Sequence, residues 1–493
     1  MAELNEALIK DVVAEVLGRL GAGNGGSSGS AAPAPSAEPK KDCKCNGASG
    51  DHGVFATAND ACDAAQAAFL QLREKGVAAR RQVIDIVKTM CDDNSQEWGR
   101  IELEESKIGR LDHKIEKLQI IKNVPGVEWL NPYGMSGDNG ITLEEYTPFG
   151  VIGAITPSTH SIPTLAGNVV NMVAAGNAVV FNAHPSAARC AAMAVREFNK
   201  AIERATGIKN LICIIEQPTL DSFAELCANE YIRLLCVTGG PAVVAAAMKT
   251  GKRAICAGPG NPPVLVDDTA CMDRAASSII TGGAYDNNLL CIGEKEVFVL
   301  ENTFGKFMSA MERNGAVQLN ATQLDALTQA AFTFKDGEGG GCSHAAVNKD
   351  FIGKDASVLA NAAGVSIPNG TQLLFAETDA DHPFVYEEQM MPFIPIVRVK
   401  SVEEGIERSK EAEHNYKHTS IIHSHNVNHM TAMARALDTT LFVKNGPCGA
   451  GLGLGGEGYL SFSIATPTGE GITNPKTFTR VRRCVMVDNL RIY

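Results

Sequence analysis

Apolar and polar positions follow two alternating patterns through the first half of the chain. Short apolar runs rich in β-branched residues have the composition of strands buried in a parallel sheet; they occupy residues 151–155, 179–182, 211–215, 234–238 and 254–256. The segments between them have helical periodicity, as in 163–175 and 186–205, with Ser186 as the expected cap of the latter and Gly207 just beyond its end. This alternation predicts a doubly wound α/β domain.

The pattern continues on both sides of this domain. Helical periodicity precedes it at 57–74 and 78–91, and a second alternation of strands and helices begins near Pro263. We expect the second alternation to form a separate domain whose cleft faces the first. Residues 129–147 and 472–493 have alternating or β-branched character, which predicts further strands.

Residues 1–20 have the pattern of an amphipathic helix, with leucines and valines at positions 4, 8, 12 and 16 and charged residues between them. Residues 21–50 are rich in Gly, Ala, Ser and Pro, a composition that cannot bury enough apolar surface to order itself. Such a tethered helix either folds back on the protein or lays its apolar stripe in a groove of a partner. Its mixed charges argue against a membrane-surface helix and a mitochondrial transit peptide.

Composition narrows the classes of function. A chain of 493 residues, 45% of them hydrophobic, is long enough for two or more domains. The formal charge of -12 argues against a nucleic-acid partner, and the sequence contains neither a secretory signal nor an apolar run that could span a membrane. The 14 cysteines are scattered without a CxxC pair, which favours reduced thiols in a cytoplasm over disulfides or a metal site.

Candidate chemistry centres on Cys291, which lies between the polar run 285–288 and the strand-like run 296–300, a setting typical of a nucleophile. Two motifs follow it: Glu-Glu-Gln-Met-Met-Pro-Phe-Ile-Pro at 387–395 and Lys-Asn-Gly-Pro-Cys at 444–448. With these residues the chain resembles the aldehyde dehydrogenases over nearly its whole length. The resemblance is strongest to the CoA-acylating propionaldehyde and acetaldehyde dehydrogenases of bacterial microcompartments.

The resemblance implies the aldehyde dehydrogenase fold, which is α/β. We expect a Rossmann-like domain that binds NAD and CoA at 51–262, an α/β catalytic domain at 263–465, and a small β oligomerisation arm at 466–493 to which 129–147 contribute. The arm would pair subunits into a homodimer or homotetramer. The helix 1–20, on the flexible linker 21–50, would be an encapsulation peptide that binds a microcompartment shell protein.

A cysteine thiolate suits aldehyde oxidation, because it makes the carbonyl carbon tetrahedral, so that hydride can leave, and later departs from a thioester. Only roughly a few per cent of an ordinary thiol is ionised at neutral pH, so we expect a helix N-terminus, the positive ring of NAD or a nearby cation to help. The oxyanion needs donors, of which the backbone N–H of Cys291 can be one. Relatives supply a side-chain amide where this chain has His160, which can donate from its ring; Thr159 or backbone is the alternative, and a purely structural loop histidine is a third interpretation.

A NAD site is expected at the carboxyl ends of the strands of the first domain. Gly239 and Gly240 lead from Thr238 into a helix begun by proline, where a pyrophosphate can approach the helix N-terminus. His184 and Glu388 match residues that lie near the two riboses in relatives, although ordinary loop polarity would also explain them. The cofactor-binding residues implied by the resemblance are Thr156, Pro157, His184, Thr238, Gly239, Gly240, Gly258 and Glu388.

Residues 451–456 satisfy the GxGxxG pattern, but they follow no convincing strand and lead into a strand-like run at 459–464 rather than a helix, so we predict a turned loop near the catalytic cleft. Hydrolytic relatives begin the motif at 257–263 with a glutamate that activates water, where this chain has Ala257. Loss of a general base slows attack by water by roughly 10²–10⁴-fold, which leaves the thiol of CoA as acyl acceptor unless Glu294 or Glu387 substitutes.

The resemblance thus implies an enzyme that converts a short-chain aldehyde, propionaldehyde before acetaldehyde, with NAD and CoA as co-substrates, inside a microcompartment of the bacterial cytoplasm. No metal, nucleic acid or membrane is expected to take part. One alternative is a hydrolytic or phosphorylating aldehyde dehydrogenase, which would turn over without CoA. Another is a shell-binding adaptor on a degenerate aldehyde dehydrogenase fold, which would produce no NADH.

Overall fold

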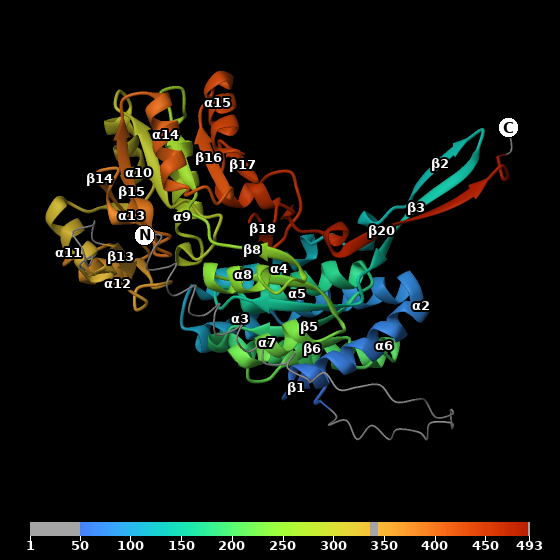
Figure 1. The fold of residues 1–493 in the computed structure, drawn as a ribbon. Coiled ribbons are helices and arrows are strands. Elements are labelled where there is room, and N and C mark those ends of the chain that lie inside the picture. The colour runs from blue at the N-terminus through green and yellow to red at the C-terminus, as the bar shows by residue number, and fades with distance from the viewer. Residues whose placement is uncertain (1–49, 336–343, 492–493) are drawn as a thin grey trace, which may run out of the picture.

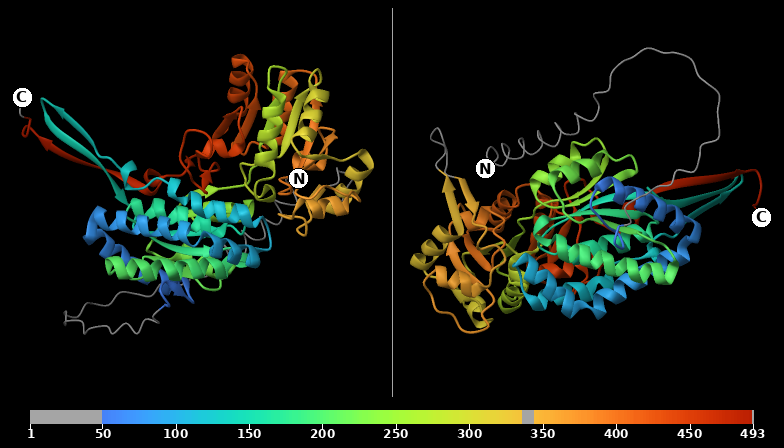
Figure 2. Two further views of the ribbon diagram at one scale, coloured as in Figure 1. Left: turned by 180° about the vertical axis from the view of Figure 1, so that it is seen from behind. Right: turned by 90° about the horizontal axis from the view of Figure 1, so that it is seen from below.

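The computed structural model describes residues 50–335 and 344–491. Two α/β bodies lie against each other, and a thin three-stranded arm projects from the first (Figure 1). Both views of Figure 2 show the arm standing clear of the two bodies. The predicted helix 1–20 and nearly all of the linker 21–50 lie outside the described residues.

The first body contains a six-stranded parallel sheet in the order β1-β6-β5-β4-β7-β8. Its strands are β1 Val54–Phe55, β4 Val151–Thr156, β5 Ala178–Ala183, β6 Ile212–Ile215, β7 Ile232–Thr238 and β8 Arg253–Ala257. The five strands predicted from apolar runs are confirmed. The strand order reverses between β4 and β7, and ligands of open α/β sheets bind outside the carboxyl ends of strands at such a point.

The helices of the first body are α2 Ala58–Asp93, α3 Ser95–Ser106, α4 Leu111–Gln119, α5 Ser161–Ala174, α6 Ala188–Thr206, α7 Leu220–Ala228 and α8 Pro241–Met248. The two helices expected at 57–74 and 78–91 are the two arms of α2, which bends at Gly76 (φ 71°). Gly207 ends α6 as predicted, in the left-handed conformation. The predicted cap at Ser186 is wrong, because the first N–H groups of α6 donate instead to the carboxylate of Glu105 on α3.

The second body contains a seven-stranded parallel sheet in the order β11-β14-β15-β10-β9-β16-β17. Its strands are β9 Pro263–Val266, β10 Glu296–Leu300, β11 Val317–Gln318, β14 Leu374–Thr378, β15 Phe393–Val399, β16 Thr419–His423 and β17 Leu441–Lys444. Its helices are α9 Met272–Gly283, α10 Phe304–Arg313, α11 Ala321–Ala331, α12 Ala356–Ala362, α13 Pro383–Tyr386, α14 Val402–Ala412 and α15 Val427–Leu437. Two small antiparallel pairs complete the structure: β12 Phe332–Lys335 with β13 His344–Val347, and β18 Ile464–Ala465 with β19 Gly471–Ile472.

The prediction of a strand at 459–464 is wrong for all but its last residue, since β18 begins at Ile464. The residues before β18 form local bonds instead. The hydroxyl of Ser461 accepts from the backbone N–H of Ser463 at 3.2 Å and lies 2.7 Å from the hydroxyl of Thr473. These side-chain bonds compete with strand pairing.

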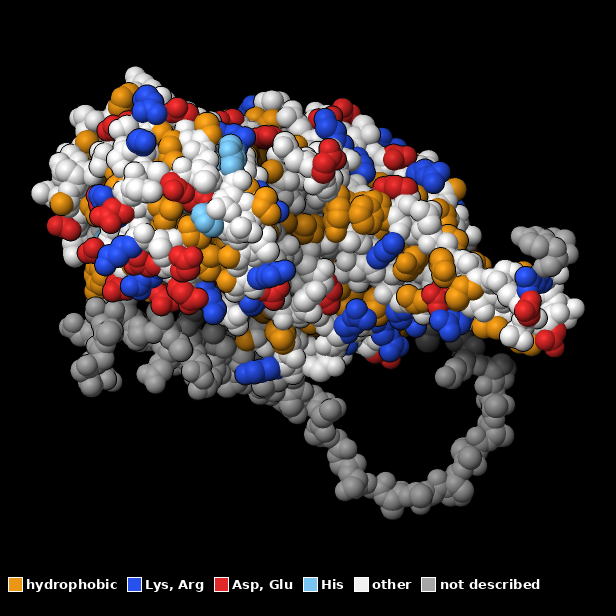
Figure 3. All heavy atoms as spheres, turned by 90° about the horizontal axis from the view of Figure 1, so that it is seen from above, with side chains coloured by type: hydrophobic (Ala, Val, Ile, Leu, Met, Phe, Trp, Pro, Cys, Tyr) orange, Lys and Arg blue, Asp and Glu red, His pale blue; other side chains and the backbone are white. Residues whose placement is uncertain are grey.

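The arm is an antiparallel sheet in the order β2-β3-β20, built from β2 Tyr133–Gly137, β3 Gly140–Pro148 and β20 Thr479–Val487. The strands expected in 129–147 and 472–493 are therefore confirmed. Apolar side chains on the arm are exposed, among them Tyr133 (64%) and Val481 (62%). On the face shown in Figure 3, by contrast, acidic and basic side chains are interspersed, with hydrophobic ones between them. No helix among the described residues is long and apolar enough to cross a membrane.

Candidate active site

Cys291 is half-buried in the loop that leads into β10. The loop after β8 runs directly against it, because a Cβ atom at Gly260 would overlap the carbonyl oxygen of Cys291. Glycine at 260 therefore allows the end of the first sheet to approach the cysteine loop of the second body. Ala257, the last residue of β8, is 5% exposed and presents no carboxylate there.

The chain reaches Cys291 through three consecutive left-handed residues, Asp286 (φ 49°), Asn287 (φ 56°) and Asn288 (φ 63°). Side chains other than Gly, Asn and Asp rarely adopt this conformation, which costs roughly 1–2 kcal/mol per ordinary residue. The amide of Asn287 donates to the carbonyl of Gly353 at 2.9 Å, and that of Asn288 to the carbonyl of Glu294 at 2.8 Å. The polar run noted in the sequence is thus a fixed turn, and the triplet Asp-Asn-Asn was the signal for it.

Lys295, which sequence reasoning missed, forms hydrogen bonds with the backbone of the loop that carries Cys291. Its side chain is fully buried, and Nζ donates to the backbone carbonyls of Asn288 at 2.8 Å and Leu290 at 3.1 Å. Burial lowers the pKa of Lys295, and the carboxylate of Glu388 opposes this effect. The two carbonyls hold the amine in the loop that carries Cys291. Lys295 is one of the cations that the sequence could not name.

The thiol of Cys291 is nevertheless protonated at neutral pH. Burial, and then the carboxylate of Glu388, raise its pKa to about 12, against the opposing effects of Lys295 and Lys117. Burial likewise raises the pKa of Glu388 to about 7, and its carboxylate accepts from the N–H of Gly260 at 3.5 Å. Glu388, expected only as a ribose contact, therefore also acts electrostatically on the thiol of Cys291.

Glu294 and Glu387 were considered from the sequence as substitutes for the missing base that activates water. Glu294 is buried, and its carboxylate accepts from the N–H of Cys448 at 2.9 Å. Glu387 is half-exposed, and burial raises its pKa to about 7. Among the described carboxylates, Glu388 is the one that raises the pKa of Cys291.

His160 is buried at the N-terminus of α5, where its ring packs against Phe462 with centroids 5.6 Å apart. Burial, and then the charges of Lys117 and Lys114, hold its pKa well below the ordinary value, so the ring is neutral. Nδ1 lies 2.9 Å from the hydroxyl of Thr159. When that hydroxyl donates to Nδ1, the single ring hydrogen lies on Nε2 and is free to stabilise an oxyanion.

The loops after β4 and β5 bring three of the expected cofactor residues together. Thr156 ends β4, Pro157 follows it, and the backbone N–H of His184 donates to the carbonyl of Thr156 at 3.0 Å. The hydroxyl of Thr156 is buried without a hydrogen-bond partner among the described residues. An unpaired buried hydroxyl at the switch point of the sheet suits a bound nucleotide.

The turn after β7 is open on its outer side. Gly240 precedes Pro241, the first residue of α8, and no described atom lies within 4 Å of the position its Cβ would occupy. The hydroxyl of Thr238, however, is hydrogen-bonded to the hydroxyl of Ser463, with the two oxygens 2.8 Å apart. Gly258 packs against Pro467. The remaining expected residue of this turn, Gly239, bonds through its N–H to the carbonyl of Ala257 at 3.2 Å. The residues present therefore fit NAD through backbone and loop geometry more than through the side chain of Thr238.

The GxGxxG segment 451–456 is no helix N-terminus, as predicted, although β17 does precede it, contrary to the sequence argument. It forms one wall of a cavity of about 390 Å³. Leu290 and Ile292, on either side of Cys291, also line it, with Leu452 and Phe462 among the other apolar lining residues. The cavity thus offers an apolar space beside Cys291.

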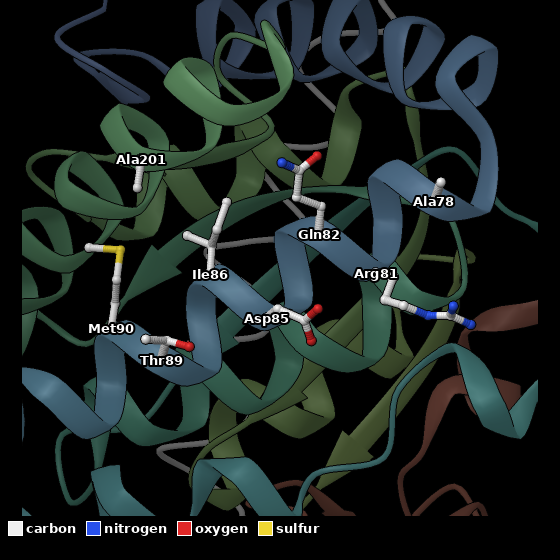
Figure 4. Close-up of a pocket in the computed structure, with 8 residues that line it drawn as sticks. All are labelled: Ala78, Arg81, Gln82, Asp85, Ile86, Thr89, Met90 and Ala201. Atoms are coloured by element: carbon white, nitrogen blue, oxygen red, sulfur yellow. The ribbon is translucent and has the colours of Figure 1, made fainter.

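A second hollow, of about 560 Å³, lies on the outside of the first body. Figure 4 shows it between α2, which contributes Gln82, Ile86 and Met90, and Ala201 of α6. None of its lining residues comes from the second body, which carries Cys291. This hollow is separate from the candidate active site.

The aldehyde dehydrogenase family model matches residues 48–331. The chain is 44% identical over 442 residues to the acetaldehyde dehydrogenase (acetylating) EutE of Salmonella typhimurium, which covers 89% of the chain and 93% of that protein. It is 38% identical to the propanal dehydrogenase (CoA-propanoylating) of the same organism, with the same coverage. A propionaldehyde dehydrogenase of Rhodopseudomonas palustris with bound propionyl-CoA superimposes with a TM-score of 0.85 at 40% identity, over 92% of the chain and 99% of that structure.

Proposed function

The chain belongs to the aldehyde dehydrogenase family, and from that premise we propose that it oxidises propionaldehyde in preference to acetaldehyde, with NAD, inside a bacterial microcompartment. The broader activity is that of its close relatives: it is a CoA-acylating dehydrogenase of short-chain aldehydes that works through an acylated cysteine. The observation that carries the acylating assignment is the end of β8, where Ala257 supplies no base to activate water beside Cys291.

Cys291 is the proposed nucleophile. Its proton passes to Glu388, whose pKa of about 7 suits a base at neutral pH. The sulfur then adds to the aldehyde carbon, and the oxyanion is stabilised by the N–H of Cys291 and by Nε2–H of His160, oriented by Thr159. Bound NAD would supply the hydride acceptor. The acyl group of the resulting thioester then passes to the sulfur of CoA. The bond to Cys291 breaks, and the departing cysteine sulfur takes the proton of the CoA thiol. Water does not compete because no carboxylate at 257 activates it.

The cofactor is proposed to lie over the carboxyl ends of β4 and β7, against Thr156 and the turn of Gly239 and Gly240. The same arrangement suits CoA, because its adenosine diphosphate portion is like that of NAD. We propose that the two use this cleft in turn, which gives ping-pong kinetics. Initial-rate patterns that require NADH and CoA to be bound together would contradict this sharing.

The apolar cavity beside Cys291 supports the proposed preference for propionaldehyde. One more methylene group buried there stabilises the bound substrate by about 0.8 kcal/mol, which corresponds to roughly fourfold in kcat/KM. The test is to measure kcat/KM for both aldehydes in the purified enzyme at saturating NAD and CoA. A ratio below one would reverse the assignment to acetaldehyde.

Recruitment into a microcompartment is proposed to use residues 1–20. Supporting it, a propionaldehyde dehydrogenase from the fucose-utilisation microcompartment of Clostridium phytofermentans covers 90% of the chain at 40% identity, with a TM-score of 0.85. The test is to fuse residues 1–20 to a fluorescent protein and to express it with a microcompartment shell. Fluorescence that stays diffuse would refute the role of this segment, and a fusion of residues 21–40 is the control.

The arm is proposed to pair subunits. Its exposed apolar side chains on β2 and β20 are costly for an isolated subunit and become buried when a second copy packs on them. The number of subunits, two or four, follows from sedimentation of the intact enzyme.

A further inference from the structure

We propose that Asp286 is a positioning residue for the nucleophile, and that its buried ion pair with Lys117 locks the loop of Cys291 to the helices of the first body. The proposal rests on the proposed function only in taking Cys291 as the nucleophile. Asp286 opens the left-handed turn before Cys291, and Lys117 projects from α4 of the other body. Both side chains are completely buried.

The pair belongs to a balanced cluster of four charges. Lys114 lies 3.0 Å from Glu102 on α3 and 3.9 Å from Asp286, and neither Lys114 nor Glu102 is more than 1% exposed. Two ammonium groups thus lie beside two carboxylates, all of them buried from solvent. Burial lowers the pKa of Lys117 and opposes ionisation of Asp286, but the two lysines hold the pKa of Asp286 below its ordinary value.

Asp286 also forms directional hydrogen bonds with Arg110, just before α4, and with His113 on α4. Its Oδ1 accepts from the backbone N–H of Arg110 at 2.8 Å, and its own N–H donates to Nδ1 of His113 at 2.8 Å. Gly109 allows this approach, since a Cβ there would overlap the carboxylate of Asp286. The turn therefore has one position relative to α4, fixed by charge and by directional bonds.

The same cluster reaches the loop of the oxyanion donor. Nζ of Lys114 donates to the carbonyl of Thr159 at 2.7 Å, and the carboxylate of Glu102 accepts from the N–H of Ile162 at 3.1 Å. These two bonds bracket His160. One buried network therefore sets the position of the nucleophile and of its proposed oxyanion donor at the same time.

A stabilising role alone does not explain this arrangement, because well-packed apolar residues usually stabilise a core as well as buried ion pairs do. Apolar residues would not, however, fix a turn within the tolerance that catalysis requires. A displacement of about 1 Å can cost roughly 10²-fold in rate. We infer that the charged cluster serves to fix the position of the turn before Cys291.

The test compares Asp286→Asn with a matched control in the full-length enzyme. Asn keeps the shape and the bond from Arg110 but removes the charge. The control is Asp267→Asn, another fully buried carboxylate, which bonds His429 at 2.7 Å on the second body and lies outside the cluster. Two quantities are measured in each variant: the single-turnover rate of NADH formation, and the pH profile of Cys291 alkylation by iodoacetamide, read by mass spectrometry.

We expect Asp286→Asn to slow single-turnover NADH formation by roughly 10²-fold. The alkylation profile should move to higher pH, because Asp286 raises the pKa of Lys117, and without it the buried amine loses the charge that lowers the pKa of Cys291. The double variant Lys117→Met with Asp286→Asn should show the same displaced profile and the same slow rate. A fall in melting temperature with unchanged rate and profile would overturn the proposal, as would equal effects of Asp267→Asn. Alkylation does not depend on turnover, so a failure of the proposed function, seen as full activity of Cys291→Ala, remains distinguishable.

Discussion

The substitution Glu388→Gln should make Cys291 more reactive in the free enzyme and yet make the enzyme slower. The carboxylate of Glu388 raises the pKa of the thiol, after burial, which is the larger cause. Removal of the negative charge therefore lowers the pKa of the thiol. Turnover should fall at the same time, because the proposed acceptor of the thiol proton is lost.

The magnitude follows from the geometry of a close charge. Burial and Glu388 together raise the thiol pKa from 9.0 to about 12. A unit charge within 4–6 Å shifts a pKa by about 1–3 units, and at the lower bound of 1 unit the thiolate population at pH 8.5 rises about tenfold. Lower basicity makes the thiolate less nucleophilic, with a Brønsted slope of about 0.4–0.5, so the net gain in alkylation rate is about threefold. Loss of a general base should lower kcat by roughly 10²-fold or more.

The effect on alkylation should itself depend on pH. The pKa of Glu388 is about 7, so at pH 5.5 the wild-type carboxyl is already protonated and the substitution removes no charge. The ratio of variant to wild-type rates should therefore rise from near 1 at pH 5.5 to about threefold at pH 8.5.

The assay follows iodoacetamide modification of Cys291 by peptide mass spectrometry, because Cys271 and Cys484 are also exposed. Glu387→Gln is the matched control: burial raises the pKa of this neighbouring carboxyl to about 7 as well, but it does not act on the thiol. A ratio that stays at 1 across the pH range, or slower alkylation of Glu388→Gln at pH 8.5, would refute the reasoning.

Three further predictions concern the acyl acceptor, stability and assembly. Ala257→Glu should restore a base and raise CoA-independent NADH formation, by up to about 10²–10⁴-fold; no increase would mean that water is excluded for another reason. Burial raises the pKa of Glu294 from 4.5 to about 7, so its stabilising effect is present below pH 4.5 and is lost as pH rises through 7. Urea unfolding of Glu294→Gln should therefore show a smaller loss of stability than wild type between pH 4.5 and 7.5, by at most about 3 kcal/mol. Val485→Asp, at a side chain 57% exposed on the arm, should shift the enzyme towards single subunits in sedimentation while its melting temperature stays within a few degrees.

The strands of the first sheet were predictable because they are buried on both faces, so that residues such as those of β5 form continuous apolar runs. The position of Cys291 in a loop before a strand was predictable from its motif, whereas its role as nucleophile stays a prediction. The cap of α6 was not, because it comes from Glu105, more than 80 residues earlier in the chain. A sequence pattern contains only local information about such contacts.

The same limit explains what was missed at the site. Asp286 and Lys117 are 169 residues apart, and Glu388 reaches Cys291 from a different segment of the second body. Their pairing depends on how two sheets and α4 come together. The left-handed turn, however, is determined by the local sequence, since Asp and Asn are the residues other than Gly that most readily accept positive φ.

The most direct test of the account is NADH formation from propionaldehyde with and without CoA, in the wild type and in Cys291→Ala. The account predicts sustained turnover only with CoA and none in the variant. Equal turnover of the wild type without CoA would mean that water reaches the thioester and that the argument from Ala257 is wrong. Undiminished turnover of Cys291→Ala would contradict the nucleophile itself.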